Sequence, residues 1–299
     1  MPRLSVIMPA FNAESTIRAA LQSTLRDMPR DSELVVLDDG STDATAETAA
    51  ATGDGRVRVI SRPNRGVART LNDLLDATDS ELVARMDADD VVLPGRFRRQ
   101  LRAMDDADAV FTTVVGWGTG RPTLPRPAGI SPEEFGLHLL LTNPVAHSTL
   151  LARRRAIAAA GAYRELPTED YDLWLRMARG GARLRRTALP GLAYRTHAGQ
   201  VTASAQWRRS SWLDPELAEA YAQLAEQLTG ARAARITSLS IDDSLDAAEK
   251  RQRLDEFSAR FEQAAVRLPR ASRRRLRRKL EERRAWFAAR LAPADQVPA

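Results

Sequence analysis

The sequence predicts an α/β fold, in which a mostly parallel sheet carries helices on both faces and an α-helical C-terminal region follows. Short apolar runs alternate with segments of helical period up to about residue 200, which is typical of repeated strand–helix units. Connections of this kind join parallel neighbours in one sheet. After Trp207 the composition shifts to alanine, leucine, glutamate and arginine, which favour helices.

The elements follow from the spacing of apolar residues. Apolar runs predict strands at residues 4–8, 33–37, 56–60, 81–86, 109–115 and 150–151, and helical spacing predicts helices at residues 15–25, 44–51, 67–77 and 94–104. Ligands bind beyond the carboxyl ends of the strands in such sheets. Asp39 and Asp87 each follow a strand, so we expect the two acidic clusters to meet in one crevice.

Composition excludes several classes of protein. The chain has 299 residues, enough for one large domain and a smaller appendage, and it has no cysteine, which excludes disulfides and thiolate chemistry. The apolar run at the N-terminus is too short for a signal peptide, and no window reaches the ~20 apolar residues of a membrane-spanning helix. We therefore expect a soluble, cytoplasmic protein.

The turn Asp87-Ala88-Asp89-Asp90 places three carboxylates within four residues at the end of a predicted strand. Like charges this close repel one another, and a divalent cation or a basic partner relieves the repulsion. Mg²⁺ and Mn²⁺ take a few carboxylate oxygens and keep positions for phosphate and water. The turn therefore predicts a metal–phosphate site, with a solvated acidic turn as the alternative.

Five motifs in order carry a resemblance to a known family: SVIMPAFNAESTI, ELVVLDDGSTDAT, NRGVARTLNDLL, ELVARMDADDVVLPGRF and TEDYDLWLRMA. In this order they resemble the inverting glycosyltransferases of family two, which have the GT-A (Rossmann-like) fold. The resemblance covers roughly residues 3–200 and implies transfer of a sugar from a nucleotide donor to a hydroxyl group, on a bacterial surface glycan or a lipid-linked acceptor.

The resemblance implies a nucleotide site built from several loops: Pro9, Ala10, Asn12, Asp39, Arg65, Gly66, Arg69, Asp87 and Ala88. Asp39 would accept a hydrogen bond from the base. An ionised carboxylate only accepts, so it favours an imide N–H such as that of uracil or thymine, and thus a UDP- or dTDP-sugar. A turn or helix-cap acid is the alternative for Asp39.

The resemblance also implies metal ligands and a base. Asp89, with Asp87 and His197, would hold Mn²⁺ or Mg²⁺, while Asp90 would support the site or cap the next helix. Asp170, beside Glu169, would be the general base that deprotonates the acceptor hydroxyl in a single inverting displacement.

Two further residues fall on the acceptor side in the resemblance. His147 would contact sugar hydroxyls, and Trp174 follows the predicted base on the same segment. The alternative for His147 is a structural hydrogen bond.

We expect a glycosyltransferase domain over residues 1–206, with a nucleotide-sugar half to about residue 117 and an acceptor half from residue 118. Residues 207–299 form the helical, basic region. Between Arg267 and Arg290 there are eleven basic residues against two glutamates, although the whole chain carries only +6.

The basic region has two interpretations. Leu276, Leu280, Phe287 and Leu291 form a narrow stripe on a helical wheel, flanked by arginines. The helix either lies on an anionic membrane surface, at the inner face of the membrane, or docks its stripe on the body or on a second subunit as a homodimer. Nucleic acid is not an expected partner, because no recognised motif accompanies the charge.

Two other functions compete. A nucleotidyltransferase on a similar sheet would call for a glycine-rich, basic loop after the first strand, and residues 9–14 contain neither glycine nor lysine. The second is a non-catalytic nucleotide-binding or interaction module, which has no need to keep Asp87, Asp89 and Asp170.

Overall fold

The computed structural model describes residues 2–118, 122–124, 128–196 and 204–291. The chain forms two compact units. Unit 1 comprises Met1–Pro132, Val145–Glu165 and Gly180–Ala203, and unit 2 comprises Glu133–Pro144, Leu166–Arg179 and Ser204–Ala299. The chain passes from unit 1 to unit 2 for the last time after Ala203, close to the domain boundary expected at residue 206. Two earlier segments, Glu133–Pro144 and Leu166–Arg179, also belong to unit 2.

Unit 1 is built on one eight-stranded sheet of order β3-β2-β1-β4-β7-β6-β8-β5. The strands are β1 (Leu4–Ala10), β2 (Ser32–Asp38), β3 (Val57–Ser61), β4 (Leu82–Arg85), β5 (Val91–Val92), β6 (Ala109–Gly118), β7 (Leu151–Arg153) and β8 (Leu184–Thr196). β1 to β4 are parallel to one another, whereas β7 is antiparallel to both β4 and β6. The predicted α/β class is therefore confirmed, with a mixed second half.

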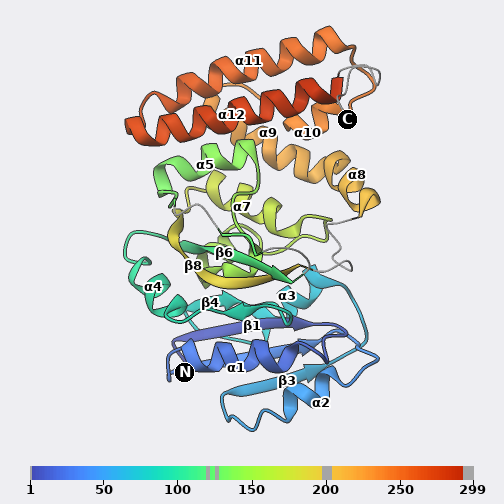
Figure 1. Ribbon diagram of the computed structural model, residues 1–299, viewed down its shortest axis with the longest axis vertical. Coiled ribbons are helices and arrows are strands. Elements are labelled where there is room, and N and C mark those ends of the chain that lie inside the picture. The colour runs from blue at the N-terminus through green and yellow to red at the C-terminus, as the bar shows by residue number, and fades with distance from the viewer. Residues whose placement is uncertain (1, 119–121, 125–127, 197–203, 292–299) are drawn as a thin grey trace. The chain divides into compact units, whose positions relative to one another are not determined.

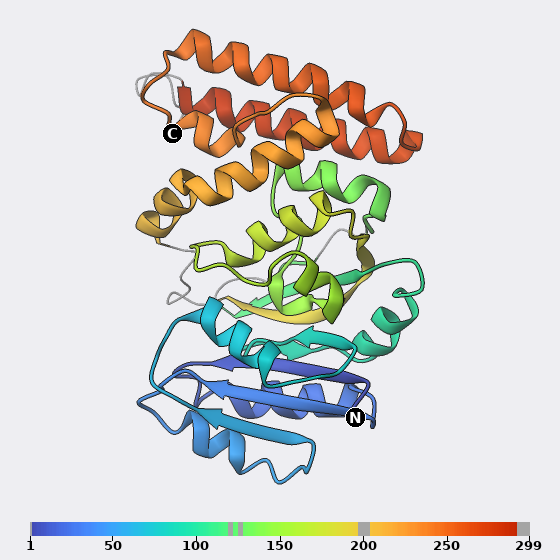
Figure 2. The same cartoon turned by 180° about the vertical axis from the view of Figure 1, so that it is seen from behind.

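Side chains that alternate along the buried strands pack against helices on opposite faces of the sheet. Leu4, Val6 and Met8 of β1 share a core cluster with Ile17 and Leu21 of α1 (Ile17–Asp27). The intervening Ile7 is also fully buried, and α3 (Val67–Asp76) contacts β1 and β2. In Figure 1, α1 lies in front of the strands. Figure 2 gives the view from the opposite side, where α3 lies in front of them. The remaining short helices of this unit are α2 (Thr45–Ala50), α4 (Arg96–Arg102), η1 (His147–Thr149) and α6 (Arg154–Ala159).

The described part of unit 2 is helical. Its helices are α5 (Pro132–Leu141), α7 (Glu169–Arg179), α8 (Ala205–Leu213), α9 (Pro215–Thr229), α10 (Ile236–Ser240), α11 (Ala247–Ala265) and α12 (Arg270–Leu291). Local sequence sets several ends: Asp214 caps α9 with Pro215 in its first turn, and Asp246 and Glu249 form a capping box on α11. Gly230 ends α9 in the left-handed conformation, with φ of 77°.

The stripe expected on the last helix is covered within unit 2. Leu276, Leu280 and Phe287 of α12 are at most 2% exposed. The helix packs on α10 and α11, and α11 and α12 lie side by side in both views (Figures 1 and 2). Arg275 also donates to both carboxylate oxygens of Glu134 on α5, at 2.8 and 3.1 Å. The stripe is therefore covered by neighbouring helices of the C-terminal region itself.

Across the described ranges, none of the helices is both long and apolar enough to cross a bilayer.

Candidate active site

A cavity of about 840 Å³ opens in unit 1 beyond the carboxyl ends of β1, β2 and β4. Eight of the residues expected at a nucleotide–metal site line it: Pro9, Ala10, Asn12, Asp39, Gly66, Asp87, Ala88 and Asp89. The parallel register explains why they meet, because Ala10 pairs with Asp38 and Ile7 pairs with Arg85. The expectation that the acidic clusters after β2 and β4 converge is confirmed.

Asn12 ties the loop after β1 to the loop after β2. Its backbone has φ of 48°, a left-handed conformation that asparagine tolerates better than most residues. Its Oδ1 accepts a hydrogen bond from the N–H of Thr42 at 2.9 Å, and its own N–H donates to Oγ of Ser41 at 2.8 Å. These bonds fix one wall of the cavity.

Asp39 organises another part of the cavity lining. Its Oδ1 accepts hydrogen bonds from the main-chain N–H of Arg65 at 3.0 Å and from Nε of Arg62 at 3.2 Å, and Oδ2 accepts one from the N–H of Gly66 at 2.9 Å. Gly66 has φ of 86°, which favours glycine. Asp39 therefore holds the 62–66 loop and still lines the cavity, where one acceptor position of Oδ2 stays open to a ligand.

The three carboxylates of the turn after β4 lie close together. Ligand oxygens of Asp87, Asp89 and Asp90 are all within 4.8 Å of one another. Arg85 forms a two-point pair with Asp87, through Nη2–Oδ1 at 2.5 Å and Nη1–Oδ2 at 2.9 Å. Asp87 and Asp89 both line the cavity, and both side chains are half-buried.

Asp90 is 1% exposed, and its Oδ1 accepts a hydrogen bond from the main-chain N–H of Arg195 at 2.8 Å. Its Oδ2 is buried and makes no hydrogen bond of regular geometry in the described chain, and the nearby Ser148 side chain lowers the pKa of the carboxyl by less than burial raises it. Burial, and then the Asp87 carboxylate, raise the pKa of Asp90 to about 7. Hard oxygen donors in this cluster, one of them buried, fit a divalent cation such as Mg²⁺ or Mn²⁺.

The expected capping role of Asp90 is wrong. Helix α4 begins at Arg96 after Gly95, and the N–H groups of Gly95 and Phe97 donate to the carboxylate of Asp27 on α1. Proximity in the sequence suggested Asp90 as the cap, but the packing of α1 against this turn brings Asp27 instead.

A buried arginine supports the acidic turn from inside the sheet. Arg96 is 0% exposed, and its Nη2 donates to the carbonyl of Arg85 at 2.9 Å, while its Nε donates to Gln100 at 2.9 Å. Burial lowers the pKa of Arg96 to about 10, and the Asp90 carboxylate acts in the opposite direction. Its charge offsets part of the repulsion among the carboxylates.

A second arginine, Arg195 at the end of β8, holds the same turn. Its Nε donates to the carbonyl of Asp89 at 2.9 Å. Its guanidinium lies 4.1 Å from the ring centroid of Trp117 on β6, which is a cation–π contact. Arg195 also lines the cavity, so it connects β6, β8 and the acidic turn at the site.

Sequence reasoning missed several lining residues, among them Phe11, Val67, Arg85, Tyr194 and Arg195. Phe11 is 53% exposed and Val67 is 42% exposed, although both are apolar. The sequence did indicate Phe11, because it is the one large apolar residue among the small and polar residues at positions 9–14. The arginines carried no such signal, since this chain uses arginine throughout.

Other expected residues lie elsewhere in unit 1. The side chain of Arg65 lies 3.5 Å from Asp73, and Nε of Arg69 donates to Glu165 at 2.7 Å, so neither side chain lines the cavity. His147 is 8% exposed, and its Nε2 shares a hydrogen bond of 2.9 Å with Oη of Tyr163. This bond is of the kind expected if His147 has a structural role and does not contact sugar hydroxyls. His197 lies outside the described residues.

The expected base lies in unit 2. Glu169 and Asp170 form the first turn of α7, and Asp170 is hydrogen-bonded to Asn143 and to the N–H of Tyr171. Trp174, four residues on, is 0% exposed in the core of this unit. A side chain with no exposed surface packs in the core and cannot contact an acceptor in this structure.

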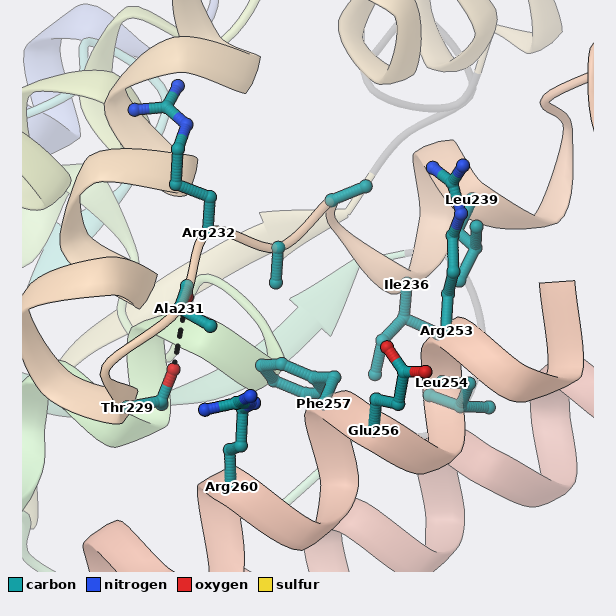
Figure 3. A pocket seen from close by; sticks show the side chains of 12 residues that line it. Thr229, Ala231, Arg232, Ile236, Leu239, Arg253, Leu254, Glu256, Phe257 and Arg260 are labelled. Atoms are coloured by element: carbon teal, nitrogen blue, oxygen red, sulfur yellow. Dashed lines mark hydrogen bonds between the residues drawn. The ribbon is translucent and has the colours of Figure 1, made fainter. Parts of the chain in front are cut away.

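Unit 2 has its own cavity, of about 290 Å³, between the segment after α9 and helix α11 (Figure 3). Its lining combines apolar side chains such as Ile236 and Phe257 with arginines such as Arg253 and Arg260. Glu256 is the one carboxylate among its lining residues. A set of acidic ligands is therefore found at the unit 1 cavity and not here.

Comparisons with known proteins agree with this geometry. The family model of glycosyl transferase family 2 matches residues 5–160. The chain is 28% identical over 207 residues to the Escherichia coli UDP-Glc:alpha-D-GlcNAc-diphosphoundecaprenol beta-1,3-glucosyltransferase WfaP, covering 68% of this chain and 81% of that protein.

Two solved structures share the fold. S. aureus TarS (residues 1–349), in complex with UDP-GlcNAc, superposes with a TM-score of 0.62 at 18% identity, covering 97% of this chain and 90% of that one. The mannosyltransferase PcManGT from Pyrobaculum calidifontis, in complex with GDP-Man and Mn²⁺, gives a TM-score of 0.54 at 19% identity, covering 97% and 84%.

Proposed function

Since the chain belongs to glycosyltransferase family 2, we propose that it transfers a sugar from a nucleoside diphosphate donor to a hydroxyl group of a glycan or lipid-linked acceptor in surface polysaccharide synthesis. The observation that carries this proposal is the cavity of unit 1, where Asp39, Asp87 and Asp89 converge from two strand ends. A volume of about 840 Å³ suits a ligand of nucleotide-sugar size.

The proposed donor site uses this cavity. Asp39 accepts a hydrogen bond from the base, which favours UDP or dTDP because their bases present an imide N–H. Phe11 offers an apolar face for the base, and Asp89 with Asp87 holds a divalent cation, Mn²⁺ or Mg²⁺. When bound, such a cation neutralises negative charge on the leaving diphosphate.

The proposed reaction is a single displacement with inversion. The Asp170 carboxylate takes the proton of the acceptor hydroxyl while its oxygen bonds to the anomeric carbon. The bond from that carbon to the donor phosphate breaks, and its electron pair leaves with the nucleoside diphosphate. Glu169, on the same first turn, adds negative charge beside the base.

The first test is calorimetric titration with UDP, dTDP, GDP and CDP, each with Mn²⁺ and with a chelator. We expect metal-dependent binding of a uracil or thymine nucleotide. Asp170→Asn should keep this binding and lose sugar transfer. Release of pyrophosphate in place of a nucleoside diphosphate would support the nucleotidyltransferase alternative, and binding of none of the four would support a non-catalytic module.

For the basic region we propose peripheral contact with an anionic membrane surface through arginines and not through the covered stripe. Arg270, Arg273 and Arg274 are exposed at the start of α12. Replacing these three by glutamine should reduce binding to vesicles containing anionic lipid and leave the fold intact. Equal vesicle binding by both proteins would remove the membrane role.

A further inference from the structure

Two hydrogen bonds orient the side chain of Asp170 within unit 2. Its Oδ2 accepts one from Nδ2 of Asn143 at 2.9 Å, and its Oδ1 accepts one from the main-chain N–H of Tyr171 at 2.6 Å. Each carboxylate oxygen has two acceptor positions. These two bonds therefore hold the carboxylate in one orientation.

Asn143 comes from a different segment, just after α5 ends at Leu141. Pro144 follows it, and a residue before proline is biased toward extended backbone, which turns the chain out of the helix. The amide is thereby presented beside the first turn of α7. This side-chain donor lies 27 residues before Asp170 in the chain.

Tyrosines anchor the end of α5 to its neighbours. Oη of Tyr171 donates to the carbonyl of Leu139, and Oη of Tyr221 on α9 donates to the carbonyl of Leu140 at 2.8 Å. Tyr171 and Tyr221 are 4% and 1% exposed. The residue after Asp170 thus binds α5, and the segment after α5 binds Asp170. This reciprocal connection leaves little freedom to the Asn143–Asp170 pair.

We propose that Asn143 is a positioning residue that keeps Asp170 oriented and ionised as the general base. The proposal rests on the proposed function, because it needs Asp170 to be the base. Hydrogen bonds donated to a carboxylate favour its ionised form, and only the ionised form accepts a proton. A merely structural amide would support folding without affecting how the rate depends on pH.

The test compares Asn143→Ala with wild type in sugar transfer across pH. We expect kcat to fall about tenfold at neutral pH, the KM for the donor to stay within about twofold, and the acid limb of the kcat profile to move up by about one pH unit. Gln223→Ala is the matched control, since it removes another amide–carboxylate hydrogen bond in this unit, to Glu219 at 2.7 Å. It should leave the profile unchanged.

A second measurement does not depend on turnover. The ¹³C carboxyl signal of Asp170, identified by its loss in Asp170→Asn, should titrate at higher pH in Asn143→Ala. It should titrate higher still in Asn143→Asp, which keeps the side-chain shape and adds a negative charge; this variant also serves if Asn143→Ala does not fold. Unchanged titration in the variants would overturn the positioning role.

The two proposals fail separately. Normal transfer with an unshifted pH profile in Asn143→Ala would leave the glycosyltransferase proposal standing and remove Asn143 from it. A wild-type protein that binds no nucleotide and transfers no sugar would overturn the function, while the carboxyl titration would still report on the Asn143–Asp170 pair.

Discussion

Arg195 holds Asp89 from a strand more than a hundred residues away: its Nε donates to the Asp89 carbonyl at 2.9 Å. The same guanidinium packs on Trp117. The acidic turn is therefore fixed through its main chain beside the cavity that Asp89 lines.

Arg195→Ala should loosen this turn. We expect the free energy of unfolding to fall by about 1–3 kcal/mol, because the Asp89 carbonyl loses its donor, and UDP affinity in Mn²⁺ to fall as well. Urea unfolding and calorimetry measure the two effects. The matched control is Arg183→Ala, since Nε of Arg183 also donates to an aspartate carbonyl, that of Asp106 at 2.7 Å, on an exposed edge. Equal UDP affinity in both variants would contradict the role of Arg195.

Asp89→Ala should abolish the metal dependence of nucleotide binding, because of the two carboxylates left in the cluster Asp87 is paired with Arg85 and Asp90 is 1% exposed. Titration with UDP in Mn²⁺ and in chelator should give the same weak affinity. Asp105→Ala removes an exposed aspartate of unit 1 outside the cavity and should retain the metal effect. A persisting difference between Mn²⁺ and chelator in Asp89→Ala would exclude Asp89 as a ligand.

Phe11→Ala should weaken nucleotide binding by about tenfold, since contact between a base and an aromatic ring contributes about 1–3 kcal/mol. Phe11 and Leu189 are both 53% exposed apolar residues of unit 1, but only Phe11 lines the cavity. Leu189→Ala is therefore the control, and its affinity for UDP should match wild type. Equal UDP affinity of Phe11→Ala and Leu189→Ala would contradict a contact between Phe11 and the base.

Leu280→Ala should destabilise unit 2 by about 2–5 kcal/mol, because the side chain is 2% exposed against the other C-terminal helices. Arg274→Ala, on an exposed face of the same helix, should change stability little. Thermal unfolding compares the two. Equal melting temperatures of the two variants would mean that the apolar stripe of α12 is not packed on its neighbouring helices. The stripe would then be free to contact a membrane surface.

Asp54→Asn tests how the interaction of Asp54 with Arg56 contributes to the free energy of unfolding as the pH changes. Hydrogen bonds from the side chain and then the backbone of Arg56 lower the pKa of Asp54 from 3.8 to about 2. The ionised form therefore stabilises the fold above pH 4, and the contribution is lost as the pH falls toward 2. On this partly exposed pair we expect a loss of about 1 kcal/mol at pH 6 in urea unfolding, shrinking at pH 3. A difference from wild type that is constant with pH would contradict the ion pair.

Strands β1, β2 and β4 could be predicted because buried parallel strands are near-continuous apolar runs, and the half-exposed β3, VRVIS, still has apolar residues at alternate positions. Residues 4–8 and 33–37 became β1 and β2 with small extensions. Helices α9 and α11 also have local end signals in the sequence: Asp214, Pro215 and Gly230 for α9, and Asp246 for α11. In these segments the local signal and the final packing agree.

Strand β8 could not be predicted. Its sequence, LRRTALPGLAYRT, lacks alternation and contains Pro190 and Gly191, and its pairing with β6 is irregular between Phe111 and Val114. A Cβ on Gly191 would lie 2.6 Å from Oγ1 of Thr112, so the strand needs glycine for close approach. Glycine is required at residue 191 only because β6 packs beside β8 in the folded protein. Missing β8 meant missing Tyr194 and Arg195 as well.

The sequence by itself determined the α/β order, the acidic turn after β4 and the placement of Asp39, Asp87 and Asp89 at strand ends, because these follow from local periodicity. Only the tertiary structure decided the partners of those charges: Arg85 for Asp87, Arg195 for Asp89, and Asn143 for Asp170. It also placed Trp174 in the core. Position along a strand fixes where a side chain emerges, but its hydrogen-bond partner depends on distant segments that packing brings beside it.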